Sequence, residues 1–496
     1  MTMRLCELLS DRAERATRGP FLVDARSDRV VRAGALDSAA RAWRGELDAH
    51  RVPPGGRVLV DVNDPVAFAV VHLSVIAAGR CSATIDPEAP PAEVVRARRA
   101  LRPALALTDR AERPGLRVDA DSGLPLEPSG GTGWRWALGV GSPGSSALLT
   151  SGSTGTPKTV VLGEHQLLHV AAAVARHHEL GPADRGFNPL PLFHINAQVV
   201  GLLASLVAGA TLVLDRRFRR TDFWPLLAEH DVTWLNGVPA ILAILAREDI
   251  PVLPPRLRFI RSASAALPTP VRETITGRTG VPVVESYGMT EAASQITATP
   301  LGAPARDGSV GTAVGVELEV VDATGARCAP GVVGRVRIRG AGVIRGYADG
   351  AAAASFNGGH WLDTGDLGHR DADGYLYLAG RSDDVVNRGG ELVYPREVEE
   401  VLLAEPGVAD AVVVGRPHDV LGAVPVACVR SPAELDAAAA AELVRRLTAR
   451  CAEQLARFKR PAEIRVVGGF PLGPTGKVRR TELRRQLADE LTAVSR

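Results

Sequence analysis

The chain has 496 residues, and lysine, methionine and aromatic residues are all scarce in it. Three of its 58 basic residues are lysines, Lys158, Lys459 and Lys477, and the other 55 are arginines. Abundant Ala, Gly, Pro and Arg are typical of a GC-rich genome, which explains the scarcity of lysine but not the positions where lysine remains. These three positions are therefore candidates for sites that need a compact ammonium on a flexible stem, which the planar guanidinium of arginine does not supply.

Cysteine and net charge are also low. The five cysteines are scattered, with no CxxC pair and an odd total, which argues against a disulfide framework and against a structural zinc site. A net charge of +2 with interspersed signs offers no basic surface for nucleic acid or for a membrane. The N-terminal sequence lacks the apolar core of an export signal. We therefore expect a cytoplasmic protein with reduced thiols that binds neither nucleic acid nor a membrane.

The most prominent uncharged stretch runs from Ile195 to Leu214 and contains Asn196, Gln198 and Ser205. These polar residues and its place in mid-chain predict a buried helix followed by a strand rather than a membrane span.

Short β-branched runs alternate with Ala- and Leu-rich helical stretches over the first three hundred residues. The predicted strands are 57–62, 210–215, 232–238, 257–263 and 281–288, and the helices between them include 65–78, 164–178 and 222–229. This alternation predicts an α/β fold with parallel sheets covered on both faces. From about 308 to 380 the texture changes to short strands with Gly/Asp turns, which predicts a small antiparallel β subdomain.

The last part of the chain has its own pattern of elements. A helix with proline at its start is predicted from Pro395, a second helix over 436–456, and three strands around them. We therefore expect a large N-terminal domain over 1–381 and a small mobile α+β domain over 382–496. The Gly-, Ser- and Pro-rich stretch 111–146 is predicted to be a loop.

The strongest local signal for a ligand site is TSGSTGTPK, between a predicted strand end and a helix starting near Glu164. Glycines let the backbone approach a ligand closely, and hydroxyls and amide hydrogens can hold phosphate oxygens. The spacing differs from that of a Walker-type phosphate loop. A flexible linker would not need a lysine in a chain with so few. The candidate phosphate-binding residues here are Thr150, Ser151, Gly152, Ser153, Thr154, Gly155, Thr156 and Lys158.

This nonapeptide resembles the phosphate loop of the adenylate-forming superfamily, which includes acyl- and aryl-CoA synthetases, peptide-synthetase adenylation domains and luciferases. Further segments follow in the order of that superfamily, so that the resemblance covers nearly the whole chain: PLFHIN (191–196), RSASAALP (261–268), SYGMTE (286–291), WLDTGDL (361–367), GRSDDVVNRGGELVYPREVE (380–399) and PLGPTGKVRR (471–480). The resemblance implies an AMP-forming ligase that uses ATP and Mg²⁺. A carboxylate attacks the α-phosphorus of ATP, pyrophosphate leaves, and the acyl-adenylate then reacts with a thiol, by default that of coenzyme A.

The resemblance also implies a role for individual residues. As catalytic residues it implies Lys477 and Thr290 near the α-phosphate, Glu291 as the Mg²⁺ ligand, and His194 at the border of the acid pocket. The remaining nucleotide-binding residues that it implies are Ser264, Ala265, Ala266, Glu285, Ser286, Tyr287, Gly288, Asp366 and Arg381. The acid pocket that it implies consists of His194, Asn236, Gly237, Gly288, Met289 and Ser294.

Several of these residues have a plainer interpretation on their own. Asp366, in a Thr-Gly-Asp sequence, is equally typical of a turn. Tyr287 is compatible with a core aromatic residue, and His194 with a packed core histidine. Lys459, in RFKRP, fits a surface or structural role at least as well as substrate contact.

A hinge at Asp383 is implied between the two domains. In one orientation the C-terminal domain presents Lys477 to the adenylate site. In the other it presents Gly389 and Gly390 and opens a channel for a phosphopantetheine thiol. Glycines allow a ligand to approach the backbone closely, although an ordinary hairpin turn also favours Gly-Gly.

The segments FIRSASAAL, ESYGMTEAASQ, NRGGE and PREVE most resemble the branch of oxalate- and small-acid-CoA ligases. That branch carries His at the position of Ser294 and Lys at the position of Leu392. The missing imidazole predicts a monocarboxylate of moderate size, such as an aryl or arylacrylic acid, rather than a dicarboxylate.

The acceptor stays open at this point. Coenzyme A is the default. The alternatives are a carrier-protein thiol in a biosynthetic cluster, or a non-thiol acceptor, including ATP-dependent nitrite activation for diazotisation of an aromatic amine. A catalytically broken binding module would have lost Lys477, Glu291 or Asp366, and all three are present. We expect a monomer or a homodimer.

Overall fold

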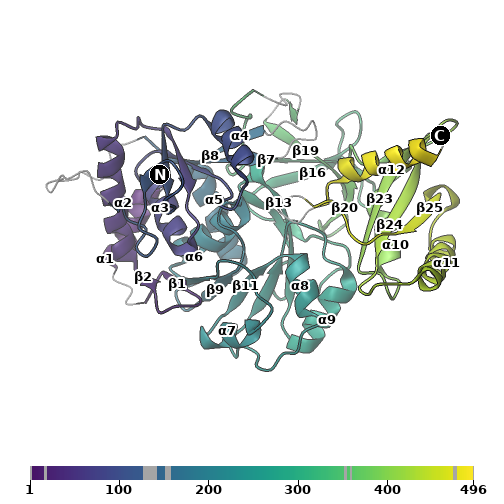
Figure 1. Ribbon diagram of the computed structural model, residues 1–496, viewed down its shortest axis with the longest axis horizontal. Helices are drawn as coiled ribbons and strands as arrows, with labels where there is room; N and C mark the ends of the chain where they lie inside the picture. The colour runs from purple at the N-terminus through teal and green to yellow at the C-terminus, as the bar shows by residue number, and fades with distance from the viewer. Residues whose placement is uncertain are drawn as a thin grey trace.

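The computed structural model describes residues 3–15, 19–126, 142–150, 158–350, 355–357, 360–472 and 478–494. The elements run from N-terminal helices on one side of the molecule to a C-terminal unit on the other (Figure 1). Parallel sheets, an antiparallel subdomain and a C-terminal α+β unit are all present, so the predicted fold class is confirmed.

A six-stranded sheet carries the phosphate-loop segment. Its order is β6-β5-β3-β4-β7-β8, with every neighbouring pair parallel except β7 and β8. The strands are β3 (Arg57–Asp61), β4 (Cys81–Thr84), β5 (Leu105–Thr108), β6 (Leu116–Arg117), β7 (Ser145–Thr150) and β8 (Lys158–Gly163). The predicted loop 111–146 thus contains the short strand β6, which the sequence did not indicate.

A nine-stranded sheet carries most other predicted site segments. Its order is β15-β14-β13-β12-β11-β9-β10-β1-β2, parallel from β13 to β1 and antiparallel at both edges. The strands are β1 (Leu22–Asp24), β2 (Val30–Val31), β9 (Arg185–Asn188), β10 (Thr211–Leu214), β11 (Trp234–Gly237), β12 (Phe259–Ser262), β13 (Val283–Met289), β14 (Ser294–Ala298) and β15 (Thr312–Ala313). Strands β10, β11 and β12 are buried along their whole length, and polar residues near the C-terminal ends of β11 and β12 are also buried.

Helices fill the space between these two sheets and cover their outer faces. The inner layer consists of α3 (Pro65–Ala77), α5 (Glu164–His177), the π-helix η1 (Ala197–Leu203) and α6 (Ala204–Ala208), flanked by α1 (Leu5–Glu14) and α2 (Ala33–Ala49). The outer layers consist of α4 (Pro91–Leu101) on the six-stranded sheet, and of α7 (Phe223–Glu229), α8 (Pro239–Leu245) and α9 (Thr269–Thr279) on the nine-stranded sheet.

The inner layer explains two sequence features. Helix α3 is apolar all round because nearly every one of its side chains is buried. The uncharged stretch from Ile195 to Leu214 forms a buried helix followed by β10, as predicted. Its residues Ala197–Leu203 form a π-helix, which the sequence did not indicate.

The antiparallel subdomain follows the nine-stranded sheet in the chain. Its strands are β16 (Glu317–Val321), β17 (Gly334–Arg339), β18 (Phe356–Asn357), β19 (Trp361–Arg370) and β20 (Leu376–Arg381). The register of β19 and β20 places Asp366 opposite Arg381.

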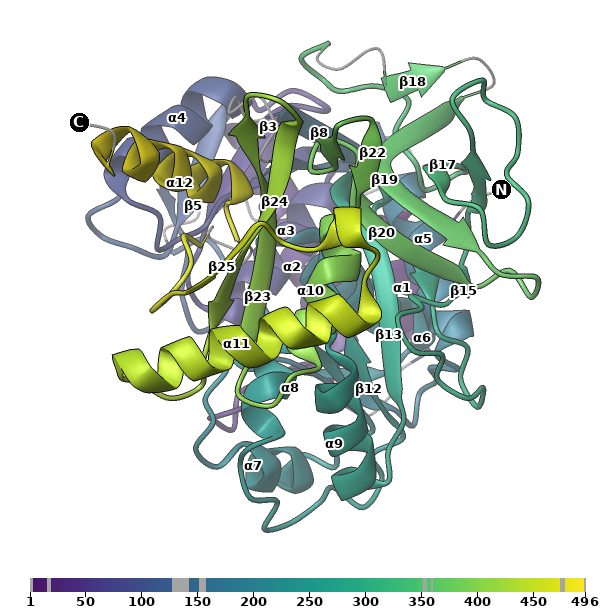
Figure 2. The ribbon, with the colours of Figure 1, turned by 90° about the vertical axis from the view of Figure 1, so that its right-hand side faces the viewer.

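The C-terminal unit has apolar clusters of its own, formed by residues beyond 385. Its strands are β21 (Val386–Arg388), β22 (Glu391–Val393), β23 (Asp410–His418), β24 (Gly422–Arg430) and β25 (Glu463–Val466), and its helices are α10 (Pro395–Leu403), α11 (Ala437–Gln454) and α12 (Arg480–Val494). Figure 2 shows this unit facing the viewer, with α11 crossing in front of the strands. Helix α10 begins at proline, as predicted.

Candidate active site

The first and last residues of the predicted phosphate-loop segment lie on the antiparallel strands β7 and β8. Thr150 ends β7, Lys158 begins β8, and the two residues are paired across the antiparallel strands. The predicted loop residues Ser151, Gly152, Ser153, Thr154, Gly155 and Thr156 and the predicted catalytic Lys477 lie outside the described residues.

Lys158 and Glu291 meet at a tyrosine that the sequence analysis missed. The Nζ atom of Lys158 lies 4.9 Å from the centroid of the Tyr347 ring. The hydroxyl of Tyr347 donates to Oε1 of Glu291 over 2.8 Å. Burial, and next the charge of Glu291, raise the pKa of Tyr347, so that its hydroxyl remains a donor at neutral pH. The chain has only five tyrosines, and this scarcity was the available signal.

Three predicted nucleotide-binding residues lie together on β13, β19 and β20. The hydroxyl of Tyr287 donates to Oδ2 of Asp366 over 2.5 Å, and the Arg381 guanidinium lies 3.3 Å from Oδ1. Burial and the charge of Asp366 raise the pKa of Tyr287 well above its usual value. Asp366 lies within β19 and not in a tight turn. The preceding Gly365 has a φ of +74°, and a Cβ there would come within 2.8 Å of Arg381.

Of the predicted acid-pocket residues, His194 lies in the segment before η1, and the others lie on β11, β13 and β14. Gly288 lies against Ser294 so closely that a Cβ on it would come within 1.5 Å of the Ser294 carbonyl oxygen. Met289 and Ser294 are paired across β13 and β14, and Ser294 has a φ of 97°. His194 is half-buried, with its ring 4.3 Å from that of Phe193, just before the π-helix. Because π-helical turns are frequent at functional sites, η1 agrees with a pocket at this place.

Asn236 and Gly237 are the last two residues of β11. Asn236 is fully buried and donates to Oδ1 of Asn188 over 2.9 Å. A Cβ on Gly237 would meet Cδ1 of Leu242 on α8 at 2.8 Å, so the Leu242 side chain would have to move.

Arg261 on β12 also faces this region, and the sequence analysis did not select it. Its guanidinium donates to the side chains of Asn196, Asn236, Ser286 and Gln295 over 2.7–3.1 Å. Burial lowers the pKa of Arg261 to about 9, which leaves it protonated at neutral pH. The available signal was a charged residue inside the apolar run LRFIRSA.

The predicted adenine loop is exposed, whereas Glu285 is buried. Ser264, Ala265 and Ala266 are all exposed, and Ser264 has a φ of 76°. The carboxylate of Glu285 lies 3.7 Å from Nε of Arg272, and burial raises its pKa to about 7. Glu285 thus directs its side chain to α9 rather than to the exposed loop.

The predicted hinge lies between two sets of ion pairs. Asp383 lies 3.5 Å from Nε of Arg381 on β20. The next residue, Asp384, lies 3.6 Å from Nε of Arg480 and also pairs with Arg484, both on α12. The chain therefore changes from contacts with the antiparallel subdomain to contacts with the C-terminal unit between two consecutive residues.

Gly389 and Gly390 form the exposed turn between β21 and β22, with φ values of 63° and 95°. Both values lie in the left-handed region, as a two-residue hairpin of this kind requires. Lys459 donates to Glu397 on α10 over 2.6 Å, which supports the structural interpretation of this lysine.

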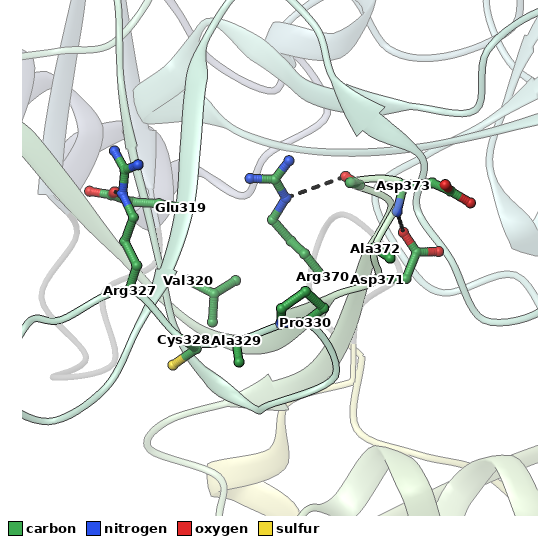
Figure 3. Close-up of a pocket in the computed structure, with 11 residues that line it drawn as sticks. Glu319, Val320, Arg327, Cys328, Ala329, Pro330, Arg370, Asp371, Ala372 and Asp373 are labelled. Atoms are coloured by element: carbon green, nitrogen blue, oxygen red, sulfur yellow. Dashed lines mark hydrogen bonds and ion pairs between the residues drawn. The ribbon is translucent and has the colours of Figure 1, made fainter.

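A cavity of about 320 Å³ lies on the antiparallel subdomain, away from the predicted residues (Figure 3). Its charged lining is largely self-paired, since Arg327 lies 2.5 Å from Glu319 and Arg370 donates to the carbonyl of Gly374. No predicted site residue lines it, and we do not regard it as the active site.

Within the described ranges, no group of three or more His, Cys, Asp and Glu side chains could hold a metal ion. Mg²⁺ in nucleotide-dependent enzymes is usually held by one or two carboxylates together with substrate phosphates. The buried Glu291, positioned by Tyr347, suits such a ligand. No helix among these residues is long and apolar enough to cross a membrane.

The two α/β sheets, the antiparallel subdomain and the C-terminal unit form the fold expected of an adenylate-forming enzyme, and Tyr287, Asp366 and Arg381 lie together within it. Family models described as AMP-binding enzyme and AMP-binding enzyme C-terminal domain match residues 10–348 and 397–477. The chain belongs to the AMP-binding enzyme family.

Individual relatives support the same class. The chain is 41% identical over 382 residues to a sulfoacetate–CoA ligase of Cupriavidus necator, covering 76% of this chain and 71% of the relative. It is 36% identical over 352 residues to an oxalate–CoA ligase of Arabidopsis thaliana, covering 69% and 67%.

Solved structures agree over almost the full length. The o-succinylbenzoate CoA synthetase of Bacillus subtilis with its acyl-adenylate intermediate has a TM-score of 0.82 at 28% identity, covering 96% of this chain and 97% of the other. An anthranilate CoA ligase with anthranoyl-AMP has a TM-score of 0.86 at 25% identity, covering 99% and 98%. The chain is thus an AMP-forming acid–CoA ligase that uses ATP, Mg²⁺ and coenzyme A, as the motifs predicted.

Proposed function

We propose that this ligase activates a short carboxylic acid as its acyl-adenylate and transfers the acyl group to the thiol of coenzyme A in the cytoplasm. The observation that carries the proposal is that two polar groups lie at the C-terminal end of β13. Tyr287 binds Asp366, and Glu291, four residues further, binds Tyr347. The first group suits a ribose and adenine, and the second, beside Lys158, suits phosphates and their metal ion.

The residues then have the following roles. Asp366 and Arg381 hold the ribose, Tyr287 fixes the Asp366 carboxylate and flanks the adenine, and Thr290 donates to the α-phosphate. Glu291 holds Mg²⁺, which when bound neutralises phosphate charge. Lys477 stabilises the charge that develops as the carboxylate oxygen bonds to the α-phosphorus and pyrophosphate leaves.

We also propose that residues 1–381 and 382–496 act as two domains that rotate about Asp383. After adenylate formation the rotation withdraws Lys477 and brings Gly389 and Gly390 to a channel for the incoming thiol. The thiolate then bonds to the acyl carbon, and AMP leaves. The consecutive ion pairs of Asp383 and Asp384 with different units support this position for the hinge.

The size of the acid is inferred from the relatives and from the pocket. The sulfoacetate and oxalate ligases are named for acids of two carbons. In this chain Asn236, Arg261 and Gln295 are buried polar side chains beside the predicted pocket residues, which suits a short polar acid.

The test is incubation of the full-length protein with ATP, Mg²⁺ and single acids, with and without coenzyme A. The panel contains short dicarboxylates, sulfonated acids, fatty acids and aromatic acids, with nitrite as an inorganic arm. We expect AMP and an acyl-CoA of matching mass with a short acid. AMP that forms only with a carrier protein, or with nitrite and an aromatic amine, would replace coenzyme A as the acceptor and contradict the proposal.

A further inference from the structure

The buried guanidinium of Arg261 forms the centre of a polar cluster contributed by five elements. Asn196 precedes η1, Asn236 lies on β11, Ser286 on β13 and Gln295 on β14. All four accept hydrogen bonds from Arg261, which is 1% exposed. Asn236 is itself a predicted pocket residue, and the other three lie one or two residues from one, namely His194, Gly288 and Ser294.

The positive charge of Arg261 has no carboxylate partner among the described residues, because its acceptors are all neutral amides or a hydroxyl. A buried charge without a counter-ion is costly, and in proteins it is usually paired. The pKa of about 9 reflects burial alone, and the same charge contributes to lowering the pKa values of the nearby His177 and His178. The cluster therefore has an uncompensated positive potential.

The orientation of the amides adds unused donors to this charge. Because arginine only donates, the oxygen atoms of Asn196 and Gln295 must face Arg261, and their amide nitrogens face away. Both nitrogens are buried without a hydrogen-bond partner, as is Nε of Arg261. Three unpartnered donors around a positive charge are suited to an anion and not to an apolar group.

We propose that Arg261 makes the acid pocket selective for a short acid that carries a second anionic group, a carboxylate or a sulfonate, away from the carboxylate that is activated. Arg261 acts as a positioning residue: it supplies the charge and turns the amides of Asn196 and Gln295 toward the second group. This proposal replaces the monocarboxylate substrate that was expected from Ser294 with a doubly charged acid. It rests on the proposed activation of a short acid.

The test compares acids of nearly equal shape that differ in charge. Malonate is paired with acetoacetate, and sulfoacetate with methylsulfonylacetate, and AMP formation is measured at saturating ATP, Mg²⁺ and coenzyme A. For the wild-type protein we expect kcat/KM to be at least about tenfold higher for the dianion of each pair. The difference should lie mainly in KM, because the second group binds equally in the ground state and in the transition state.

Two variants separate charge from folding. Arg261→Met removes the charge. Gln295→Glu keeps the arginine and gives it a carboxylate partner at the position of an existing acceptor. This variant still tests the role of the charge if Arg261→Met does not fold. Each is expected to lower the dianion preference by about tenfold or more while the KM for ATP changes little. The matched control is Arg258→Gln, since Arg258 pairs with Asp184 outside the cluster and should leave the preference unchanged.

The outcomes are distinguishable. A dianion preference that both folded variants retain, or a wild-type preference for the uncharged partner of each pair, overturns the role of Arg261 and leaves the proposed function intact. If no acid supports AMP formation, the proposed function fails, and this inference fails with it.

Discussion

The hydroxyl of Tyr347 lies 2.8 Å from the carboxylate of Glu291, and the ammonium of Lys158 lies above the same ring at 4.9 Å from its centroid. One tyrosine therefore connects the predicted metal ligand to the only lysine of the phosphate-loop hairpin. A cation above an aromatic face is attracted by the ring, and a hydrogen bond to a carboxylate fixes the carboxylate oxygen. The geometry makes Tyr347 the residue that contacts both charged side chains, which we propose lie beside the phosphates of ATP.

Replacing Tyr347 with phenylalanine should therefore weaken the use of Mg²⁺ specifically. The variant keeps the ring beneath Lys158 and loses only the bond to Glu291. A hydrogen bond to a charged group contributes about 1.5–3 kcal/mol, so we expect the Mg²⁺ concentration for half-maximal AMP formation to rise at least several-fold. Tyr347→Ala should cost more, because it also removes the ring contact with Lys158.

The matched control for this experiment is Tyr377→Phe. It removes a hydroxyl 3.3 Å from Asp371 in the antiparallel subdomain and should leave the Mg²⁺ titration unchanged. A Tyr347→Phe titration that superimposes on that of the wild-type protein would show that Glu291 does not depend on Tyr347.

Glu285 should make the stability of the protein depend on pH. Burial raises the pKa of Glu285 from 4.5 to about 7, so the folded protein holds this proton where the unfolded chain has released it. Because the unfolded state binds fewer protons between pH 4.5 and 7, stability falls as pH rises through that window and is level above it. The shift corresponds to about 3 kcal/mol.

Glu285→Gln tests this dependence. The amide cannot ionise, so the variant should be more stable than the wild-type protein at pH 8 and nearly equal to it at pH 4.5. The measurement is thermal unfolding at pH steps from 4.5 to 8. Glu273→Gln, an exposed substitution on the same helix α9, is the control and should shift nothing. Parallel curves for the wild-type protein and Glu285→Gln at every pH would refute the buried proton.

The candidate site was predicted from sequence to the extent that its residues lie in local motifs. Tyr287, Asp366 and Arg381 were found because each belongs to a short recognisable segment, and the structure brings all three together. Tyr347 was missed because it reaches Glu291 across 56 residues of chain, and Arg261 because its four partners come from other elements. Contacts of this kind depend on sheet order and register, which local patterns do not encode.

Gly288 should tolerate no side chain. A Cβ would come within 1.5 Å of the Ser294 carbonyl oxygen, so Gly288→Ala must displace β14 together with Ser294 and Gln295. We expect loss of AMP formation and a fall in stability of about 1–3 kcal/mol, which is typical of overpacking. The control is Gly277→Ala on α9, where a Cβ meets nothing within 4 Å and alanine should slightly stabilise the helix. Equal melting temperatures for Gly288→Ala and the wild-type protein would show that β14 can move without cost.

Asp383→Pro should separate the two half-reactions. In the described chain the amide of Asp383 donates no backbone hydrogen bond, so proline removes none in the present arrangement. Proline does fix φ, and a hinge residue must change its backbone angles to rotate the C-terminal unit. We expect acid-dependent pyrophosphate release in the first turnover to persist and acyl-CoA formation from the bound adenylate to fall by at least tenfold. The control is Glu434→Pro, in an exposed loop of the C-terminal unit, which should slow neither step. Equal losses in both steps for Asp383→Pro would place the hinge elsewhere. A proline that blocks only the rotation should spare adenylate formation, because that step needs no rotation.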